Sequence, residues 1–384
     1  MLRVLQVNKL YAPWIGGVEM IAQNIAEGLN AFPGVQCEVL VCRDRGGSTH
    51  ENLNGIPVAR VASLGTLMSM PISPSFPFRL KKVASQFDIV HVHTPFPLAY
   101  FCDWNEVKKN GARLVVHYHG HIWRRAQKVV MWGLANPDRR FMKTADRIIV
   151  TSERLLDDSQ ILAPFRDKCC VVPLSMDVGN VELLSDNEKC AARHRFGMTE
   201  DSRIVLFAGR LVYYKGVQYL IDAVRDLDVQ VLIAGSGPLH QTLQKQIDSL
   251  GLEKRVRLLG RVSDADLSVL YSIADLFVLP SAEPAEAFGF VQLEAMARGL
   301  PVINTDLPTG VPSVSLHGET GLTVPPGDSA ALKESISKIM SDNVLRSRFA
   351  ANAKQRVQLF SHDAVMHQIL SLYEELAPEA ALRR

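Results

Sequence analysis

The chain has 384 residues, more than one hydrophobic core usually supports, so two domains are expected. Hydrophobic residues make up 47% and charged residues 21%, as in soluble globular proteins, and no run approaches the ~18 apolar residues of a membrane span. Residues 1–183 contain 21 lysines and arginines against 16 acidic residues, and the remainder contains 21 against 24. The mildly basic first half suits a phosphate-bearing partner or an anionic surface, but no run of basic residues is dense enough to indicate nucleic-acid binding.

The chain begins directly with an alternating strand pattern, with no cleavable apolar segment before it. Its six cysteines show no C-x-x-C or other metal-ligand spacing, and we expect them to be buried free thiols in a reducing cytosol. These features predict a cytoplasmic protein.

Short β-rich runs alternate with helical patterns through the first half. Val18–Leu29 has apolar residues at helical spacing and lies between the first two strands. The predicted strands are Arg3–Val7, Glu38–Cys42, Ile89–His93, Arg113–Tyr118, Arg147–Thr151 and Lys168–Val172. The order of strand, helix and strand indicates βαβ units and a parallel sheet.

The second half repeats this alternation after a segment of mixed charge at 178–201. Its predicted strands are Ile204–Ala208, Val229–Ala234, Val256–Leu259, Leu276–Leu279 and Pro301–Asn304. We therefore predict an α/β protein of two doubly wound halves: residues 1–183, residues 184–360, and a C-terminal helix at 361–384 that returns to the first domain. Ligands of such sheets bind beyond the carboxyl ends of the strands, so the loops there are the places to search.

Three of these loops suit a diphosphate. Gly16 and Gly17 separate the first strand from its helix, but they lack the G-x-G-x-x-G spacing of dinucleotide folds and a plain turn is equally consistent. Arg210 and Lys215 follow the first strand of the second half, and they can clamp a diphosphate although such cations are more often solvated. Gly237, after the next strand, permits close approach of the backbone.

The densest pattern is the segment 281–299. Glu286 lies in the loop after Leu276–Leu279, and Glu294 lies in the helix that follows. The amides of Phe288 and Gly289 lie where that helix starts and can face an anion or a sugar hydroxyl. A carboxylate near a helix start is also a common cap, so neither glutamate is decisive alone.

Here the chain resembles the family 4 retaining glycosyltransferases, whose shared pattern is E-x-F-G-x-x-x-x-E. Glu286, Phe288, Gly289 and Glu294 fill every fixed position. The resemblance extends over nearly the whole chain through these further stretches: Gly16–Glu19, Gly209–Gly216, Asp306–Pro312 and Glu319–Asp328. It implies the GT-B fold, in which two Rossmann-like domains face each other across a cleft.

The resemblance also implies roles for individual residues. Glu294 is expected to bind the ribose hydroxyls of a nucleotide-sugar donor, and Glu286 to hold hydroxyls of the donor sugar with the amides of Phe288 and Gly289. Arg210 and Lys215 are expected to neutralise the diphosphate, with Gly17 approaching it from the other domain. Arg261 is expected near the base.

A histidine of the first domain is also expected near the donor sugar. His119 aligns best with that position, because it lies just past a strand end. For His117, within the strand, a structural role is favoured, and His121 is left without a role.

The resemblance favours same-face attack, in which the leaving phosphate oxygen accepts the acceptor's proton. Arg210 and Lys215 would then replace the metal ion of other transferases, and we predict no cofactor and no required metal. Two Asp-x-Asp triplets occur, at Asp226/Asp228 and Asp264/Asp266, and both are expected to be cap or loop residues.

The acceptor side is less defined. The apolar loop Leu67–Phe78, followed by cations, and the mixed segment Trp123–Trp132 can rest on the anionic inner face of the cell membrane and receive a lipid diphosphate, or they can be a covered loop and an ordinary amphipathic helix. The closest likeness within the family is to bacterial O-antigen and exopolysaccharide enzymes, of the kind that make lipopolysaccharide. It favours a GDP-mannose-type donor and a glycan or polyprenyl-diphosphate-linked acceptor.

Three alternative functions differ in how well they fit the sequence. A UDP-hexose or N-acetylhexosamine transferase of the same fold stays open. A nucleotide-sugar epimerase without an acceptor is disfavoured by the intact glutamate pattern. A silent binding subunit is disfavoured because no cation or glutamate of the pattern is missing.

Overall fold

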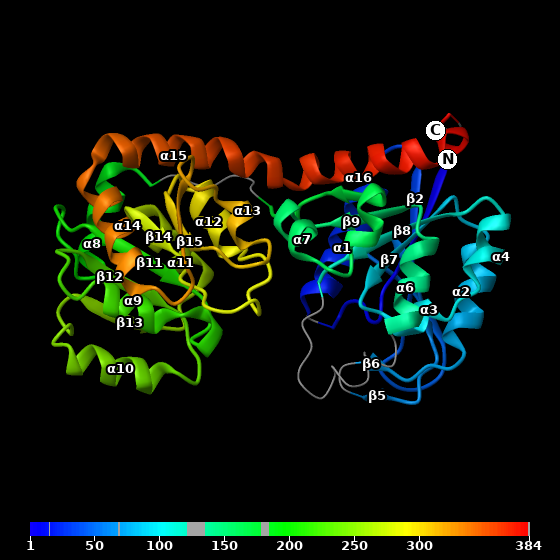
Figure 1. Ribbon diagram of the computed structural model, residues 1–384, viewed down its shortest axis with the longest axis horizontal. Coiled ribbons are helices and arrows are strands. Elements are labelled where there is room, and N and C mark those ends of the chain that lie inside the picture. Colours follow the sequence, from blue (N-terminus) through cyan, green and yellow to red (C-terminus); the bar gives the residue numbers. More distant parts are fainter. Residues whose placement is uncertain (15, 68–69, 121–134, 178–183, 383–384) are drawn as a thin grey trace. The chain divides into compact units, whose positions relative to one another are not determined.

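The computed structural model describes residues 1–14, 16–67, 70–120, 135–177 and 184–382. The chain divides into two compact units: unit 1 comprises Met1–Ser175 and His362–Arg384, and unit 2 comprises Met176–Ser361. The first crossing therefore falls before the expected boundary at residue 183. Each unit has its own mainly parallel sheet with helices packed on it, which confirms the predicted fold class (Figure 1).

Unit 1 is built on a sheet of eight strands within the described residues. In sheet order they are β10 (Cys169–Val171), β9 (Arg147–Val150), β8 (Arg113–Tyr118), β7 (Ile89–Thr94), β1 (Leu2–Val7), β2 (Val35–Cys42), β4 (Ile56–Val61) and β3 (Thr49–Leu53). All neighbours are parallel except β3 and β4. β2 flanks β1 on one side and β7 flanks it on the other, so the order of the strands along the sheet reverses at β1.

Side-chain alternation along these strands produces two cores in unit 1. One face packs against α1 (Gly17–Asn30) and α16 (His362–Leu376), and the other against α2 (Phe76–Ala84), α4 (Trp104–Lys109) and α6 (Ala135–Thr144). The remaining elements are β5 (Thr66–Leu67), β6 (Met70–Pro71), α3 (Pro97–Tyr100), α7 (Glu153–Asp158), η1 (Ala163–Lys168) and α17 (Pro378–Ala381).

Unit 2 has six parallel strands within the described residues. In sheet order they are β13 (Val256–Gly260), β12 (Gln230–Ala234), β11 (Ile204–Ala208), β14 (Leu276–Val278), β15 (Val302–Thr305) and β16 (Gly321–Val324). Numbered within the unit this is the order 3-2-1-4-5-6 of a Rossmann fold, with its switch point between β11 and β14.

The helices of unit 2 pack in neighbouring pairs. α9 (Val217–Ala223) contacts α10 (His240–Ser249) and α14 (Ser329–Ser341), whereas α11 (Asp264–Ile273) contacts α8 (Asp186–Arg195). The remaining elements are η2 (Tyr213–Lys215), α12 (Val291–Ala297), α13 (Val311–Val314), α15 (Asn343–Val357) and η3 (Gln358–Phe360).

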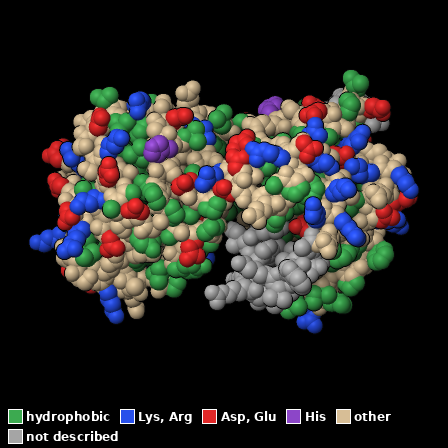
Figure 2. Space-filling view, in the orientation of Figure 1, with side chains coloured by type: hydrophobic (Ala, Val, Ile, Leu, Met, Phe, Trp, Pro, Cys, Tyr) green, Lys and Arg blue, Asp and Glu red, His purple; other side chains and the backbone are tan. Residues whose placement is uncertain are grey.

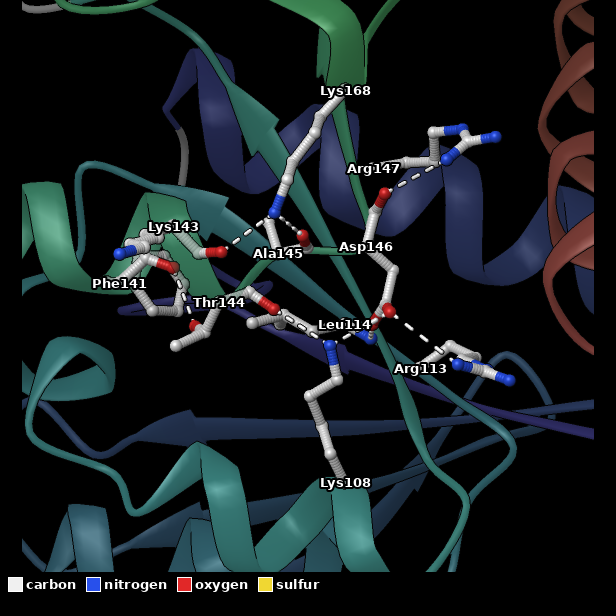
Figure 3. A network of polar contacts seen from close by, with 10 residues as sticks. All are labelled: Lys108, Arg113, Leu114, Phe141, Lys143, Thr144, Ala145, Asp146, Arg147 and Lys168. Carbon is white, nitrogen blue, oxygen red and sulfur yellow. Dashed lines mark hydrogen bonds and ion pairs between the residues drawn. The ribbon is translucent and has the colours of Figure 1, made fainter. Parts of the chain in front are cut away.

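Aspartates fix the amino ends of the strands. Asp146, just before β9, accepts hydrogen bonds from the amide of Leu114 at 2.8 Å and from Nζ of Lys108 at 2.9 Å (Figure 3). Asp88 accepts from the amide of Arg3 near the start of β1, and Asp275 accepts from the first amide of β11, that of Ile204. Because these anchors lie at the amino ends, the carboxyl ends remain available for function.

The predicted strands all occur, with ends that differ by a few residues. β3, β4, β5, β6 and β16 were not predicted. Among the described residues no helix combines the length and apolar character needed to cross a membrane. All six cysteines are free, but Cys169, Cys170 and Cys190 are only half-buried.

Candidate functional site

The loops at the carboxyl edge of the unit 2 sheet pack backbone against backbone. A Cβ atom on Gly235 would lie 1.8 Å from the carbonyl oxygen of Gly209, and one on Gly216, whose φ is +66°, would lie 1.9 Å from that of Pro280. Only glycine fits at these two positions. The loop that carries Arg210 and Lys215 is therefore held close to the loops after β12 and β14.

Lys215 and Glu286 form an ion pair at this edge. Nζ of Lys215 lies 2.5 Å from Oε2 of Glu286, and the two side chains are 11% and 10% exposed. Ser281 Oγ donates to the same carboxylate oxygen at 3.2 Å. Lys215 follows β11 and Glu286 follows β14, so the pair lies at the switch point of unit 2, where Rossmann-like sheets bind ligands.

The other predicted residues of this edge lie on neighbouring loops. Arg210 and Arg261 are exposed, after β11 and β13. A Cβ atom on Gly237 would lie 2.3 Å from the carbonyl oxygen of Leu211, so Gly237 serves the contact between two loops. Because Arg210 is exposed and forms no ion pair among the described residues, it can bind a ligand directly.

Phe288 and Gly289 form the turn before α12. Phe288 is buried, Gly289 has φ +76°, and the amides of both lack an acceptor among the described residues. Gln292 braces the turn from inside, because its Nε2 donates to the carbonyls of Phe288 and Val311 and its Oε1 accepts from Asn304 at 2.9 Å. The sequence analysis did not single out Gln292, a fully buried polar residue of α12.

Glu294 lies on α12, half-buried, and accepts a hydrogen bond from Tyr271 Oη at 2.8 Å. Burial, and then the neighbouring carboxylate, raise the pKa of Tyr271 well above its usual value, so the hydroxyl keeps its proton and donates it. Arg298 donates to the carbonyl of Glu294 and stacks on the Tyr271 ring. One carboxylate oxygen is thereby held in place, and Tyr271 is a second residue that the sequence did not reveal.

In unit 1 the loop from β1 to α1 carries a second set of predicted residues. Gly17 begins α1, is exposed, and has open space where a side chain would be. A Cβ atom on Gly16 would lie 2.2 Å from Oε2 of Glu19, so a side chain there would displace the Glu19 carboxylate. Glu19 is buried and pairs with Lys9 at 3.6 Å, a pair that was not predicted.

His119 belongs to a cluster of four histidines on the face of the unit 1 sheet that α1 and α16 cover. His91 and His93 are on β7, His117 is opposite His93 on β8, and His119 follows β8. Nδ1 of His93 lies 3.0 Å from Nε2 of His119. Burial lowers the pKa of all four rings, to about 3 for His91 and for His119, where the Lys9 cation adds to the effect. The four rings are therefore neutral at pH 7.

Two groups could be considered for a metal ion. Nitrogen atoms of His91, His93 and His117 lie within 4.8 Å of one another, but the rings are stacked within 25°, so their in-plane lone pairs do not converge on one point. Both nitrogens of His93 are already in hydrogen bonds. The second group, Cys190, His194 and Glu200, lies on the surface at α8, where the thiol already donates to Glu200.

Some predictions lie elsewhere or outside the described residues. Asp266 lies in the first turn of α11, where its amide bonds the cap Ser263, and Asp226 pairs with Lys333 on the surface, so both triplets are structural. His121 and the segment 123–132 are not among the described residues. The described part of the predicted loop 67–78 contains the end of β5, β6, which pairs with β5, and the start of α2.

Comparisons with known proteins match family models to both halves of the chain. The model of the Glycosyltransferase Family 4 matches residues 15–179, and that of the Glycosyl transferases group 1 matches residues 189–356. The chain is 29% identical to the O-antigen chain mannosyltransferase C of Escherichia coli, over 98% of this chain and 99% of that protein. It is 30% identical to the D-rhamnosyltransferase WbpZ of Pseudomonas aeruginosa, over 94% and 92% respectively.

Among solved structures, Anabaena Alr3699/HepE in complex with UDP superposes with a TM-score of 0.75 at 22% identity, covering 98% of this chain and all of that one. At this identity the likeness concerns the fold.

Proposed function

Because the chain belongs to the family 4 glycosyltransferases and has their GT-B fold, we propose that it is a retaining transferase that moves a hexose from a nucleotide diphosphate sugar to a growing glycan. The donor is of the GDP-mannose type, and the acceptor is a glycan or a polyprenyl-diphosphate-linked sugar of a surface polysaccharide. The activities named for the two relatives, transfer of mannose and of D-rhamnose, support this choice.

The observation that carries the proposal is the Lys215–Glu286 pair at the switch point of unit 2. Lys215 binds the diphosphate with the exposed Arg210, and these cations do what a metal ion does in other transferases. Glu286, held by Ser281, then accepts hydrogen bonds from hydroxyls of the sugar. The amides of Phe288 and Gly289, which have no acceptor among the described residues, donate to the sugar as well. Arg261 lies near the base.

The chemical step needs charge stabilisation at two places. The bond between the anomeric carbon and the diphosphate oxygen breaks, the bond to the acceptor oxygen forms on the same face, and the acceptor's proton moves to the leaving phosphate oxygen. Arg210 and Lys215 stabilise the departing phosphate charge, and His119 contacts a hydroxyl of the transferred sugar. No protein nucleophile is required.

A donor panel tests this function. Purified protein is incubated with GDP-mannose, UDP-glucose and UDP-N-acetylglucosamine, with and without a mannose-terminated acceptor, and the product's anomeric configuration is read by NMR. We expect acceptor-dependent use of GDP-mannose with retention. Use of a UDP-sugar would change the donor, an inverted product would contradict the mechanism, and a new donor sugar formed without acceptor would indicate an epimerase.

Replacing Glu294 with alanine should weaken GDP binding roughly 10- to 100-fold, since hydrogen bonds to a charged group contribute about 1.5–3 kcal/mol. The measurement is calorimetric titration with GDP and with 2′,3′-dideoxy-GDP. The dideoxy nucleotide should bind wild type and variant alike, because it lacks the hydroxyls that Glu294 binds. Glu334→Ala, an exposed glutamate on α14, is the control. Equal GDP affinity of wild type and Glu294→Ala would contradict the ribose assignment.

We also propose that unit 1 rests on an anionic membrane through β5, β6 and α2. Leu67 and Phe78 are 62% and 77% exposed, and Lys82 is exposed one helical turn after Phe78. Figure 2 shows hydrophobic side chains in the lower right of the view, where β5, β6 and α2 lie in Figure 1. Exposed apolar groups beside cations suit an anionic bilayer.

Co-sedimentation with phosphatidylglycerol vesicles tests this surface. The double variant Phe78→Ser, Lys82→Ser should bind several-fold less than wild type, because it loses both apolar burial and charge attraction. Val344→Ser changes a residue that is 81% exposed on unit 2 and should bind like wild type. Equal binding of all three proteins, or none with wild type, would contradict the membrane contact.

A further inference from the structure

A chain of hydrogen bonds in unit 1 leads from α16 to His119. Tyr373 Oη lies 2.5 Å from Nδ1 of His91 and 3.3 Å from Nε2 of Gln6. Oε1 of Gln6 lies 3.0 Å from Nε2 of His93, whose Nδ1 lies 3.0 Å from Nε2 of His119. The rings of His93 and His119 have an interplanar angle of 3° and centroids 5.3 Å apart, as an in-plane hydrogen bond between two imidazoles requires.

The amide of Gln6 gives this chain a direction. A neutral imidazole has one donor and one acceptor nitrogen, and burial keeps the rings of His93 and His119 neutral because it lowers their pKa. The carbonyl oxygen of Gln6 can only accept, so Nε2 of His93 carries the proton and Nδ1 of His93 accepts. Nε2 of His119 must then donate, and its Nδ1 has a free lone pair.

The other side of the amide agrees with this order. Nε2 of Gln6 donates to the hydroxyl of Tyr373, which in turn donates to Nδ1 of His91. Each hydrogen bond from His91 to His119 thus has one donor and one acceptor. Rotating the Gln6 amide by half a turn would reverse every bond and place the proton of His119 on Nδ1, so the two orders are distinguishable by experiment.

We propose that Gln6 and His93 are positioning residues that hold His119 in the Nε2–H tautomer, so that its Nδ1 accepts a hydrogen bond from a hydroxyl of the transferred sugar. The inference rests on the proposed function, in which His119 contacts that hydroxyl. Neither Gln6 nor His93 touches the sugar, because both are buried beneath His119 on β1 and β7. They act by fixing which group His119 presents to it.

His117 provides a matched control. It is as buried as His93 and stacks on both His93 and His119, with centroids 5.3 and 4.1 Å apart. Neither of its ring nitrogens has a hydrogen-bond partner among the described residues. Changing either histidine to phenylalanine keeps an aromatic ring in the stack, but only His93→Phe interrupts the chain.

The direct test is the ring-nitrogen NMR spectrum of the full chain labelled with ¹⁵N-histidine at pH 7.5, with His119 assigned from its absence in His119→Ala. We expect a protonated Nε2 and a bare Nδ1 for His119 in wild type and in His117→Phe, and a mixture of tautomers in His93→Phe. A proton on Nδ1 of His119 in the wild type would overturn the proposal without any variant having to fold. An unchanged tautomer in His93→Phe would overturn it as well.

Turnover, measured as release of GDP from GDP-mannose, gives a second readout. His93→Phe should lower kcat about 10-fold with little change in KM, because a wrong tautomer disables a correctly placed ring. His117→Phe should stay within about twofold of wild type, since it lies outside the chain of bonds. In a His119→Ala background, His93→Phe should cause no further loss, and a further loss of the same size would contradict a role through His119.

The two proposals fail separately. If wild type does not use GDP-mannose, or if His119→Ala turns over like wild type, the proposed function of His119 fails while the NMR result still decides the tautomer.

Discussion

Replacing Lys215 with methionine should lower kcat by about a thousandfold, because one preorganised donor aimed at a developing oxyanion contributes about 10²–10³ and Lys215 brings a full charge. The Lys215 side chain is only 11% exposed, and its Nζ lies 2.5 Å from Oε2 of Glu286. Because this place is poorly solvated, the electrostatic interaction of Nζ with a phosphate is stronger than it would be in water. The measurement is steady-state kinetics with the donor identified by the panel.

Breaking a buried ion pair also lowers stability, because it leaves Glu286 uncompensated. Circular dichroism should therefore show that the variant is folded before its kinetics are compared. Lys333→Met is the matched control: it removes a lysine that pairs with Asp226 at 2.6 Å on the surface of the same unit. Activity of Lys215→Met within tenfold of wild type would rule out Lys215 as the stabiliser of the leaving group.

Acidification from pH 7.5 to 5.5 should destabilise unit 1 by about 5 kcal/mol, because four neutral histidines each lose up to about 1.4 kcal/mol per pH unit below ~6.5. His91, His93 and His117 are at most 1% exposed, His119 is half-buried, and burial lowers the pKa of all four rings. The unfolded chain binds protons below about pH 6.5 while the folded chain does not, so the stability present at pH 7.5 is lost as the pH falls.

Tryptophan fluorescence during urea unfolding measures this effect in unit 1 alone, since all four tryptophans precede residue 175. His117→Phe should remove about a quarter of the pH dependence, because it removes one of the four groups. His50→Phe, an exposed histidine on β3, should leave the pH dependence unchanged. A free energy of unfolding that is equal at the two pH values would show that these rings are not held neutral by burial.

The α/β class and the family could both be predicted from the sequence, because strand and helix periodicities and the glutamate motif are local signals. The comparisons confirm the family. The pairing of Lys215 with Glu286 was not predictable from spacing, since the residues are distant in sequence and meet only through the 3-2-1-4-5-6 strand order. β3 was missed for a related reason: Thr49–Leu53 is a polar edge strand that shows no apolar face.

The chain of bonds behind His119 was missed although part of its signal was present. His91 and His93 are two positions apart in one predicted strand, so both side chains had to lie on the same face of the sheet. Gln6 is a polar residue within an apolar strand, which also marks a buried contact. What the sequence could not show is that Tyr373, from the C-terminal helix, completes the same network.

The most direct test of the central claim, that unit 2 binds a nucleoside diphosphate through its own cations, is calorimetric titration with GDP in the presence of EDTA. We expect GDP to bind wild type with the same affinity in EDTA and in magnesium, and to bind Lys215→Met at least tenfold more weakly, since a charge-assisted contact to phosphate is lost. Binding of UDP in place of GDP would correct the base alone. Binding that requires magnesium, or no binding of either nucleotide, would contradict the claim.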